Sequence, residues 1–161
     1  MNNKLLIASL LLLSVAGCDS HSNEKMLEKA KASFSKQNYG ESVVLLKNAL
    51  LKDSTNVDAR LMLAKSQLKL GAYDAAIKDF EQLERRTGVE QSSLFPEYAE
   101  ALYRTESYLA LLEKTKPKDD VSSTALYYRA LALVKVGEQE QASELITHLS
   151  MVEDSSIQNL A

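Results

Sequence analysis

Apolar side chains recur at helical spacing along most of the chain, and the pattern is clearest in residues 57–90. Before Gly71, Leu61, Ala64 and Leu68 fall on one stripe of a helix. A second stripe follows the turn and consists of Ala76, Ile77, Phe80 and Leu83. Gly71 can adopt a positive φ and end the first helix. The pattern predicts an αα-hairpin whose apolar faces need neighbouring helices.

The preceding residues repeat this pattern. Tyr39 and Tyr73 are 34 residues apart, and so are Ala30 and Ala64. This period predicts a first repeat over residues 23–56 and a second over residues 57–90. In the first repeat we expect helices over residues 24–37 and 41–52, a turn at residues 38–40, and a capping cluster at residues 53–56.

The second half of the chain continues the pattern less regularly. Residues 91–122 form a degenerate third unit in which Glu106 and its neighbours replace the glycine turn, and Pro117 ends a short second helix. Residues 123–156 restore the pattern around Gly137, and residues 157–161 begin a fifth repeat. Such an end suggests the N-terminal part of a longer array or a truncated reading frame. The alternative is a short frayed end.

Small residues at the expected helix contacts strengthen the repeat assignment. They are Ala30 and Ala64 in the first helices and Ser42, Ala49 and Ala76 in the second helices. With the 34-residue period, this pattern resembles the tetratricopeptide repeat (TPR). The resemblance implies an all-α fold, a right-handed superhelical array of about four helix–turn–helix repeats over residues 24–161.

The first residues have the pattern of a targeting signal. Residues 5–15 are almost wholly apolar, too short to span a bilayer but suitable for a signal peptide. Residues 15–18 read Val-Ala-Gly-Cys and resemble a bacterial lipobox. The resemblance implies cleavage after residue 17, lipidation of Cys18, and a polar tether over residues 18–23. An ordinary signal peptide is the alternative.

The residue after the lipid acceptor bears on localisation. Asp19 resembles the signal that retains enteric lipoproteins in the inner membrane, on its periplasmic face. The outer membrane is the alternative. Several acyl chains would make such anchoring to the cell envelope stable.

Composition and motifs narrow the function. A net charge of −3 without a basic block disfavours nucleic acid as a partner. The two histidines and the single cysteine occur in no metal-binding or nucleophile motif. Paired carboxylates such as Asp119 and Asp120 fit solvated turns better than a catalytic dyad. We therefore expect a protein without catalytic, metal or cofactor sites.

A TPR array offers a groove lined by the first helix of each repeat, to which a protein or peptide can bind. By register, the predicted lining comprises Leu27, Lys31, Phe34, Leu61, Lys65, Leu68, Lys69, Tyr127, Leu131 and Lys135, with Phe95 and Tyr103 from the third repeat. Lysines among apolar and aromatic side chains suit an extended or helical peptide with acidic residues. The alternative is that the leucines simply pack against neighbouring helices.

A narrower resemblance is to TPR lipoproteins of the PEP-CTERM/exosortase system (PrsT type). It rests on the lipobox and on residues 38–50 and 58–64. It implies a membrane-anchored scaffold in exopolysaccharide-linked protein sorting. A TPR lipoprotein of pilus or outer-membrane assembly, with a structural role, and a truncated fragment of a longer TPR protein remain as alternatives.

Overall fold

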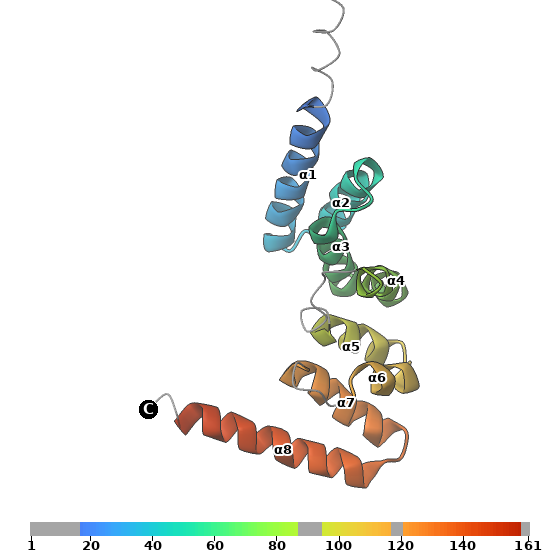
Figure 1. The fold of residues 1–161 in the computed structure, drawn as a ribbon, viewed down its shortest axis with the longest axis vertical. Helices are drawn as coiled ribbons and strands as arrows, with labels where there is room; N and C mark the ends of the chain where they lie inside the picture. The colour runs from blue at the N-terminus through green and yellow to red at the C-terminus, as the bar shows by residue number, and fades with distance from the viewer. Residues whose placement is uncertain (1–16, 87–94, 117–120, 159–161) are drawn as a thin grey trace, which may run out of the picture. The chain divides into compact units, whose positions relative to one another are not determined.

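The computed structural model describes residues 17–86, 95–116 and 121–158. These residues form helices and no strand, which confirms the all-α prediction (Figure 1). In chain order the helices are α1 (Gly17–Ser35), α2 (Tyr39–Lys52), α3 (Val57–Lys69), α4 (Tyr73–Glu84), α5 (Phe95–Arg104), α6 (Tyr108–Lys114), α7 (Ser123–Lys135) and α8 (Gln139–Gln158).

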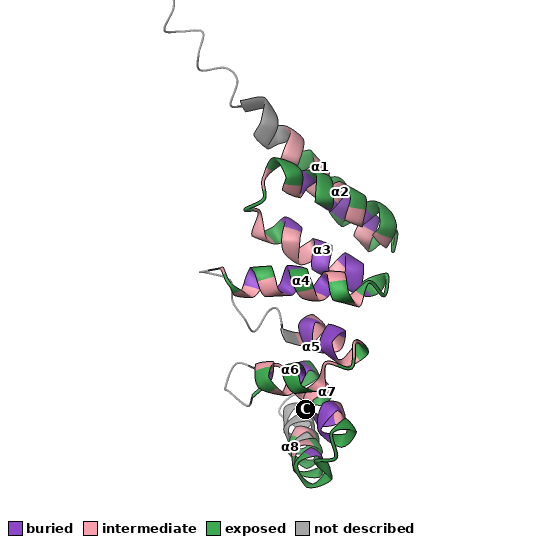
Figure 2. Ribbon diagram, turned by 90° about the vertical axis from the view of Figure 1, so that its right-hand side faces the viewer, coloured by how far each residue is buried: buried purple, intermediate pink, exposed green. Residues whose placement is uncertain are grey.

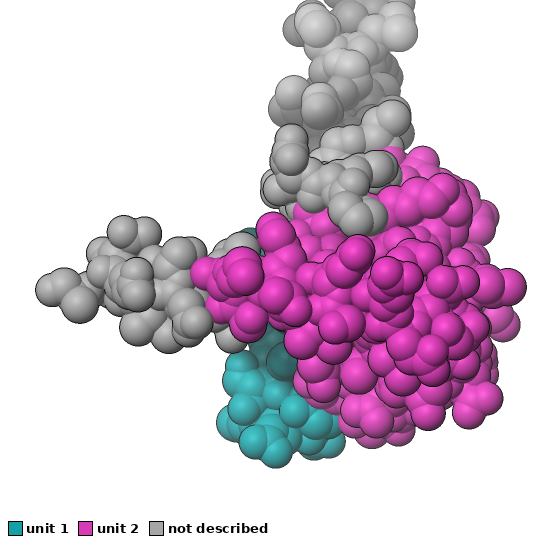
Figure 3. Space-filling view, turned by 90° about the horizontal axis from the view of Figure 1, so that it is seen from below, with its two compact units in different colours: residues 1–66 teal, residues 67–161 magenta. Residues whose placement is uncertain are grey.

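The chain divides into two compact units, residues 1–66 and residues 67–161 (Figure 3). In the first unit α1 and α2 pack as a helical pair, and the core contains Ala30, Leu46, Ala59 and Leu63. In the second unit α4 packs on α5, α5 and α6 both contact α7, and α7 pairs with α8. α5 has four buried residues, Tyr98, Ala99, Ala101 and Leu102, whereas most residues in the described part of α8, 139–151, are exposed (Figure 2).

The same backbone turn closes all four helical pairs. In each, one residue has a positive φ and ends the first helix, and we call it the turn residue. The next residue donates its N–H to the carbonyl five positions back, which is the hydrogen bond of a Schellman motif. The turn residues are Gln37 (φ 61°), Gly71 (φ 75°), Glu106 (φ 57°) and Gly137 (φ 91°). The four hydrogen bonds join Asn38 to Ser33, Ala72 to Gln67, Ser107 to Leu102 and Glu138 to Leu133, at 2.8–2.9 Å.

Counting from the turn residue gives a common register. Seven positions before it each repeat has a buried alanine: Ala30, Ala64, Ala99 and Ala130. Five positions after it lie the buried residues Ser42, Ala76, Leu111 and Ala142. The Ser42 hydroxyl hydrogen-bonds the Ala30 carbonyl and the Ser66 hydroxyl, both at 3.1 Å, so its burial leaves no polar group unpaired.

Several helix boundaries differ from the predicted ones. α1 begins at Gly17 rather than residue 24, so the predicted tether is helical. No proline interrupts residues 18–23, and the Lys52 ammonium holds this part of the helix by donating to the Ser22 hydroxyl at 2.8 Å. α2 begins at Tyr39, because Asn38 is its N-cap, so Tyr39 belongs to the helix and not to a turn.

The C-terminal helix is also longer than expected. α8 continues through Gln158, so Ile157 and Gln158 extend the fourth repeat instead of beginning a fifth. No glycine or proline lies between Gly137 and Gln158 to end the helix earlier. Residues 159–161 lie outside the described residues.

Other local predictions are confirmed. The Asn56 side chain caps α3 by accepting from the Ala59 N–H at 2.9 Å. Pro96 lies in the first turn of α5, where its missing N–H costs no hydrogen bond. α6 is short and ends at Lys114, three residues before Pro117, which itself lies outside the described residues.

Candidate functional site

Three of the predicted groove residues line one pocket of the first unit. Lys31 comes from α1, and Leu61 and Lys65 come from α3. Asp58 and Met62 complete the lining, and the cavity has a volume of about 200 Å³. It is smaller than the clefts of about 300–1,000 Å³ that hold drug-sized ligands. The pocket therefore suits one side chain of a larger partner.

Acidic side chains hold one of these lysines. The Lys31 ammonium forms an ion pair with Glu28 on the preceding turn of α1, with an Nζ–Oε1 distance of 2.8 Å. The hydrogen bond and the charge of Glu28 raise the pKa of Lys31, and Asp58 and Glu24 raise it further. Lys31 is therefore fully protonated at neutral pH, and an incoming carboxylate has to compete with Glu28 for it.

The remaining predicted residues of the first unit have mixed environments. Leu27 is half-buried and packs against the core cluster that contains Leu46 and Ala59. This is the alternative role that the sequence left open for the leucines. Phe34 is also half-buried and meets Tyr39 edge to face, with ring centroids 5.2 Å apart. Both side chains stabilise the helical pair α1–α2, so at most part of each faces a ligand.

At the end of α3 the prediction was wrong for Leu68. Its side chain is only 5% exposed, so it belongs to the core and offers no surface to a ligand. The sequence register placed it on the groove side, but the residue lies next to Gln67 on the buried side of the helix, where the turn begins. Lys69 is exposed, as a groove residue requires.

The predicted residues of the fourth repeat lie in the second unit and line other surfaces. Tyr127 is 54% exposed and lines a cleft between α7 and α8. Leu131 is half-buried and Lys135 is exposed. They do not contribute to the pocket that contains Lys31 and Lys65.

Sequence reasoning missed the acidic residues of these surfaces. Asp58 lines the pocket of the first unit, and Glu100 stands six positions before its turn residue, as Lys31 and Lys65 do. Glu100 forms an ion pair with Arg104 at 3.4 Å. Glu100 was missed because the third turn has no glycine to mark it. Counting six positions back from Glu106, the turn residue, gives the position of Glu100.

Tyrosines cluster in the second unit, and one of them, Tyr128, interacts with Glu100. Tyr103 packs against Tyr108 and Tyr128, each with ring centroids 5.7 Å apart, and Tyr128 meets Tyr127 at 5.6 Å. Burial raises the pKa of the Tyr128 hydroxyl, and the Glu100 carboxylate raises it further. The side chain of Phe95, the other residue predicted from the third repeat, lies outside the described residues.

The described residues contain neither a metal site nor a membrane-spanning helix. In that part of the chain no three histidine, cysteine, aspartate or glutamate side chains are grouped as a metal ion requires. No helix there is both long and apolar enough to cross a membrane. The apolar segment of the predicted signal, residues 5–15, lies outside the described residues, and lipidation of Cys18 stays a prediction.

The chain is similar to known proteins in part of its sequence and in its fold. Residues 33–88 match the family model of the tetratricopeptide repeat. The fold is similar to that of TTC0263, a thermophilic TPR protein in Thermus thermophilus. The TM-score is 0.58 at 22% identity, over 82% of this chain and 75% of that one. It is also similar to MamA MSR-1 C2, with a TM-score of 0.62 at 21% identity, over 81% of this chain and 74% of that one. No curated protein matches the chain.

These findings show an all-helical fold similar to that of TPR proteins, and residues 33–88 match the tetratricopeptide repeat. Proteins of this fold generally bind other proteins or peptides. The matched segment contains Leu61 and Lys65 of the pocket, and Lys31 lies just before it.

Proposed function

We propose that this chain is a membrane-anchored protein-binding scaffold of the bacterial cell envelope. The observation that carries the binding role is the pocket in which Lys31, Leu61 and Lys65 surround a small cavity. The anchoring role rests on the lipobox-like sequence that ends at Cys18. Nothing in the proposal requires a catalytic residue or a cofactor.

The pocket favours a peptide that carries an acidic residue beside an apolar one. Leu61 and Met62 supply the apolar part of its lining, and Lys31 and Lys65 supply the basic part. Asp58 and Glu28 lower the net positive charge, so binding by charge alone would be weak. Specificity then comes from the combination of a carboxylate and an apolar side chain at a fixed separation.

Charge reversal tests the binding role. The double variant Lys31→Glu/Lys65→Glu, with the full chain as bait in solubilised membranes, should lose a captured protein that the wild type retains. Lys47→Glu/Lys78→Glu is the matched control, because both lysines are exposed and neither lines the pocket. Equal capture by the two double variants would contradict the proposed site.

Substitution of the lipid acceptor tests the anchoring role separately. Cys18→Ser should abolish incorporation of labelled palmitate and move the chain from the membrane to the periplasmic fraction. Asp19→Ser should leave palmitate incorporation intact and move the chain to the outer membrane if Asp19 acts as a retention signal. A chain that stays in the membrane without Cys18 would contradict lipid anchoring.

For the pathway, we propose PEP-CTERM/exosortase-linked protein sorting. The support is the similarity of residues 38–50 and 58–64 to TPR lipoproteins of that system. The neighbouring genes provide the direct test. Exosortase and polysaccharide-export genes beside this one are expected, and pilus-assembly genes in their place would instead support a structural role in that machine.

A further inference from the structure

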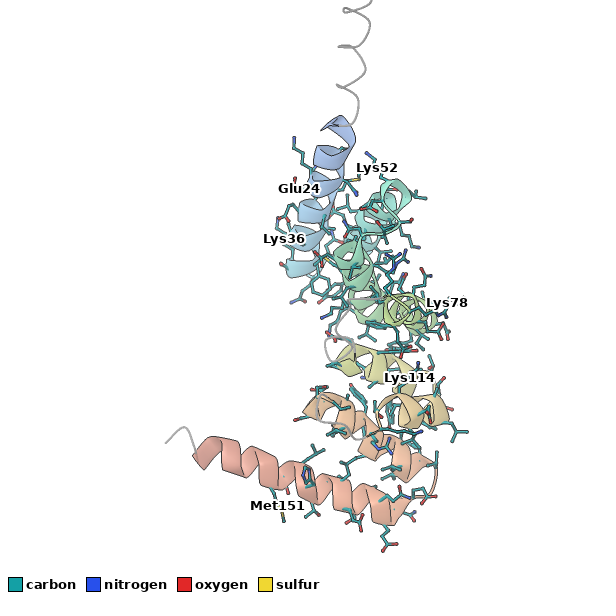
Figure 4. The ribbon with its side chains drawn as sticks, in the orientation of Figure 1. Glu24, Lys36, Lys52, Lys78, Lys114 and Met151 are labelled. Atoms are coloured by element: carbon teal, nitrogen blue, oxygen red, sulfur yellow. The ribbon has the colours of Figure 1, made fainter. Side chains whose placement is uncertain are left out.

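The first helical pair has an exposed apolar side chain at the end from which α1 begins. Leu51, the last residue but one of α2, is 84% exposed, the largest fraction among the large apolar side chains that the structure describes. Next to it in the chain, the Lys52 ammonium donates to the Ser22 hydroxyl at 2.8 Å, so the last turn of α2 lies beside the beginning of α1. Figure 4 shows Lys52 at this end of the pair and Lys36 at the opposite end.

The predicted lipid attachment is at the same end. Ser22 follows Cys18 by four positions, which is about 6 Å along an α-helix. Because α1 begins at Gly17, a helix and not an extended chain joins Cys18 to the rest of the pair. An extended tether of six residues would instead reach about 20 Å. A lipid on Cys18 therefore holds the end that contains Leu51 close to the bilayer surface.

The distribution of charge favours the same orientation. Residues 18–53 contain six lysines and five acidic residues, so their net charge is +1. Residues 54–161 contain twelve basic and seventeen acidic residues, so their net charge is −5. A bilayer with anionic lipids repels the second segment and not the first. The first helical pair is thus the part of the chain that can approach such a surface.

The charged side chains at this end suit contact with headgroups rather than with an apolar partner. Lys25 and Lys52 are exposed, and their apolar stems can lie along acyl chains while the ammonium groups reach lipid phosphates. Asp19, Glu24 and Asp53 are the acidic residues at this end, so attraction by charge alone is weak. Leu51 and the lipid anchor then supply most of the binding energy.

We propose that this end of the α1–α2 pair lies on the phospholipid bilayer, with Leu51 inserted among the headgroups and Lys25 and Lys52 against lipid phosphates. The inference rests on the proposed lipid anchor at Cys18. It also constrains the scaffold function. Lys31 of the pocket follows Cys18 by thirteen positions, about 20 Å along the helix, so the pocket binds its partner close to the membrane surface.

Fluorescence quenching by lipids with a nitroxide on the headgroup tests this arrangement. The full lipidated chain is placed in vesicles of phosphatidylethanolamine and phosphatidylglycerol, with a thiol-reactive dye on Asn48→Cys. Asn48 is exposed and lies one turn before Leu51, and lipidation consumes the thiol of Cys18. The dye at residue 48 should be strongly quenched. Lys36→Cys is the matched control, since Lys36 is exposed at the opposite end of the pair, and its dye should remain bright.

A second variant tests the role of Leu51. Adding Leu51→Glu to Asn48→Cys should lower the ratio of quenched to unquenched chains at least about tenfold, because a carboxylate replaces the inserted apolar group. The fold should be unaffected, since Leu51 is 84% exposed. Incorporation of labelled palmitate, measured on the same samples, reports the anchor separately and should not change.

Each other outcome overturns the proposal. Equal quenching at residues 36 and 48 would mean that neither end of the pair is directed toward the bilayer. A bright dye at residue 48 in a chain that contains palmitate would exclude the contact and leave the anchor intact, whereas absence of palmitate would remove the anchor itself. Quenching that Leu51→Glu does not change would exclude insertion of Leu51. A dye that is bright in vesicles but shielded in native membranes would assign Leu51 to a protein partner.

Discussion

Two joints between successive repeats of the second unit occupy equivalent positions but differ in chemistry. Between α4 and α5, Phe80 stacks on Tyr98. Phe80 lies nine positions after one turn residue, and Tyr98 lies eight positions before the next. Between α6 and α7, these two positions hold Thr115 and Arg129. Thr115 is buried, and its hydroxyl donates to the Leu111 carbonyl at 2.7 Å. The first joint is aromatic, and in the second both polar side chains donate hydrogen bonds to backbone carbonyls of α6.

The lengths of the helices explain the difference. α4 has 12 residues and α6 has 7, so α6 ends where α4 still presents a buried aromatic residue. An early end leaves the last carbonyl groups of the helix without intrahelical partners. Arg129 meets this need, because its guanidinium donates to the Leu112 carbonyl at 2.6 Å. Loss of helix length is thus compensated by a cap from the next repeat, and the register of the array continues.

Removal of the aromatic joint should have the largest effect. Phe80→Ala empties a fully buried site and should lower the free energy of unfolding by about 3–5 kcal/mol. Urea unfolding followed by helical circular dichroism measures the loss. Ile146 lies nine positions after its turn residue, as Phe80 does. Ile146→Ala should lower the free energy of unfolding by less than about 1 kcal/mol, because half of that side chain is exposed. Similar losses for the two variants would contradict the difference in burial between Phe80 and Ile146.

The polar joint should be weaker but specific. Arg129→Met keeps most of the side-chain volume and removes the donor to Leu112, and should cost about 2 kcal/mol. Burial lowers the pKa of Arg129, which is consistent with a guanidinium partly removed from water. Arg104→Met is the control, since half of the Arg104 side chain is exposed and its ion pair with Glu100 is worth about 0.5 kcal/mol. Equal costs would mean that Arg129 contributes no cap.

Alkaline pH should distinguish the joints as well. Burial raises the pKa of the Tyr98 hydroxyl well above its usual value. Native Tyr98 therefore stays protonated when the same residue of the unfolded chain ionises, near pH 10. Stability from this residue is complete below about pH 10 and falls above it by up to about 1.4 kcal/mol per pH unit. Unfolding of wild type and Tyr98→Phe between pH 9 and 11.5 checks this, and parallel profiles would contradict it.

The sequence was sufficient for whatever depends on local pattern. Apolar spacing predicted the helical pairs, and Gly71 and Gly137 marked two turns with positive φ. The start of α1 was placed too late in this way, and the contact of Ser22 with Lys52, thirty positions away, is not visible in a local pattern. The cap from Arg129 to Leu112 was missed for the same reason.

The candidate site was predictable only in part. The repeat register alone predicted that Lys31, Leu61 and Lys65 lie together. Lys31 and Lys65 occupy the same position in successive first helices, and Leu61 lies about one helical turn before Lys65. Register does not report depth of burial, so it also selected Leu68, which belongs to the core. It missed Asp58, because the prediction considered positions expected to bind a ligand and not their charged neighbours.

The smallest expected effect concerns the turns that precede the two joints. Gly71 and Glu106 have the same left-handed conformation, but only glycine adopts it without a steric penalty. Glu106→Gly should therefore stabilise the third repeat by about 0.5 kcal/mol, the small difference between relief of strain and the greater chain entropy of glycine. Gly71→Ala should destabilise the array by about 1 kcal/mol, because no clash hinders the new methyl group but its φ of 75° is unfavourable. Urea unfolding of both variants measures the two changes, and shifts of the same sign would show that the turns are not equivalent.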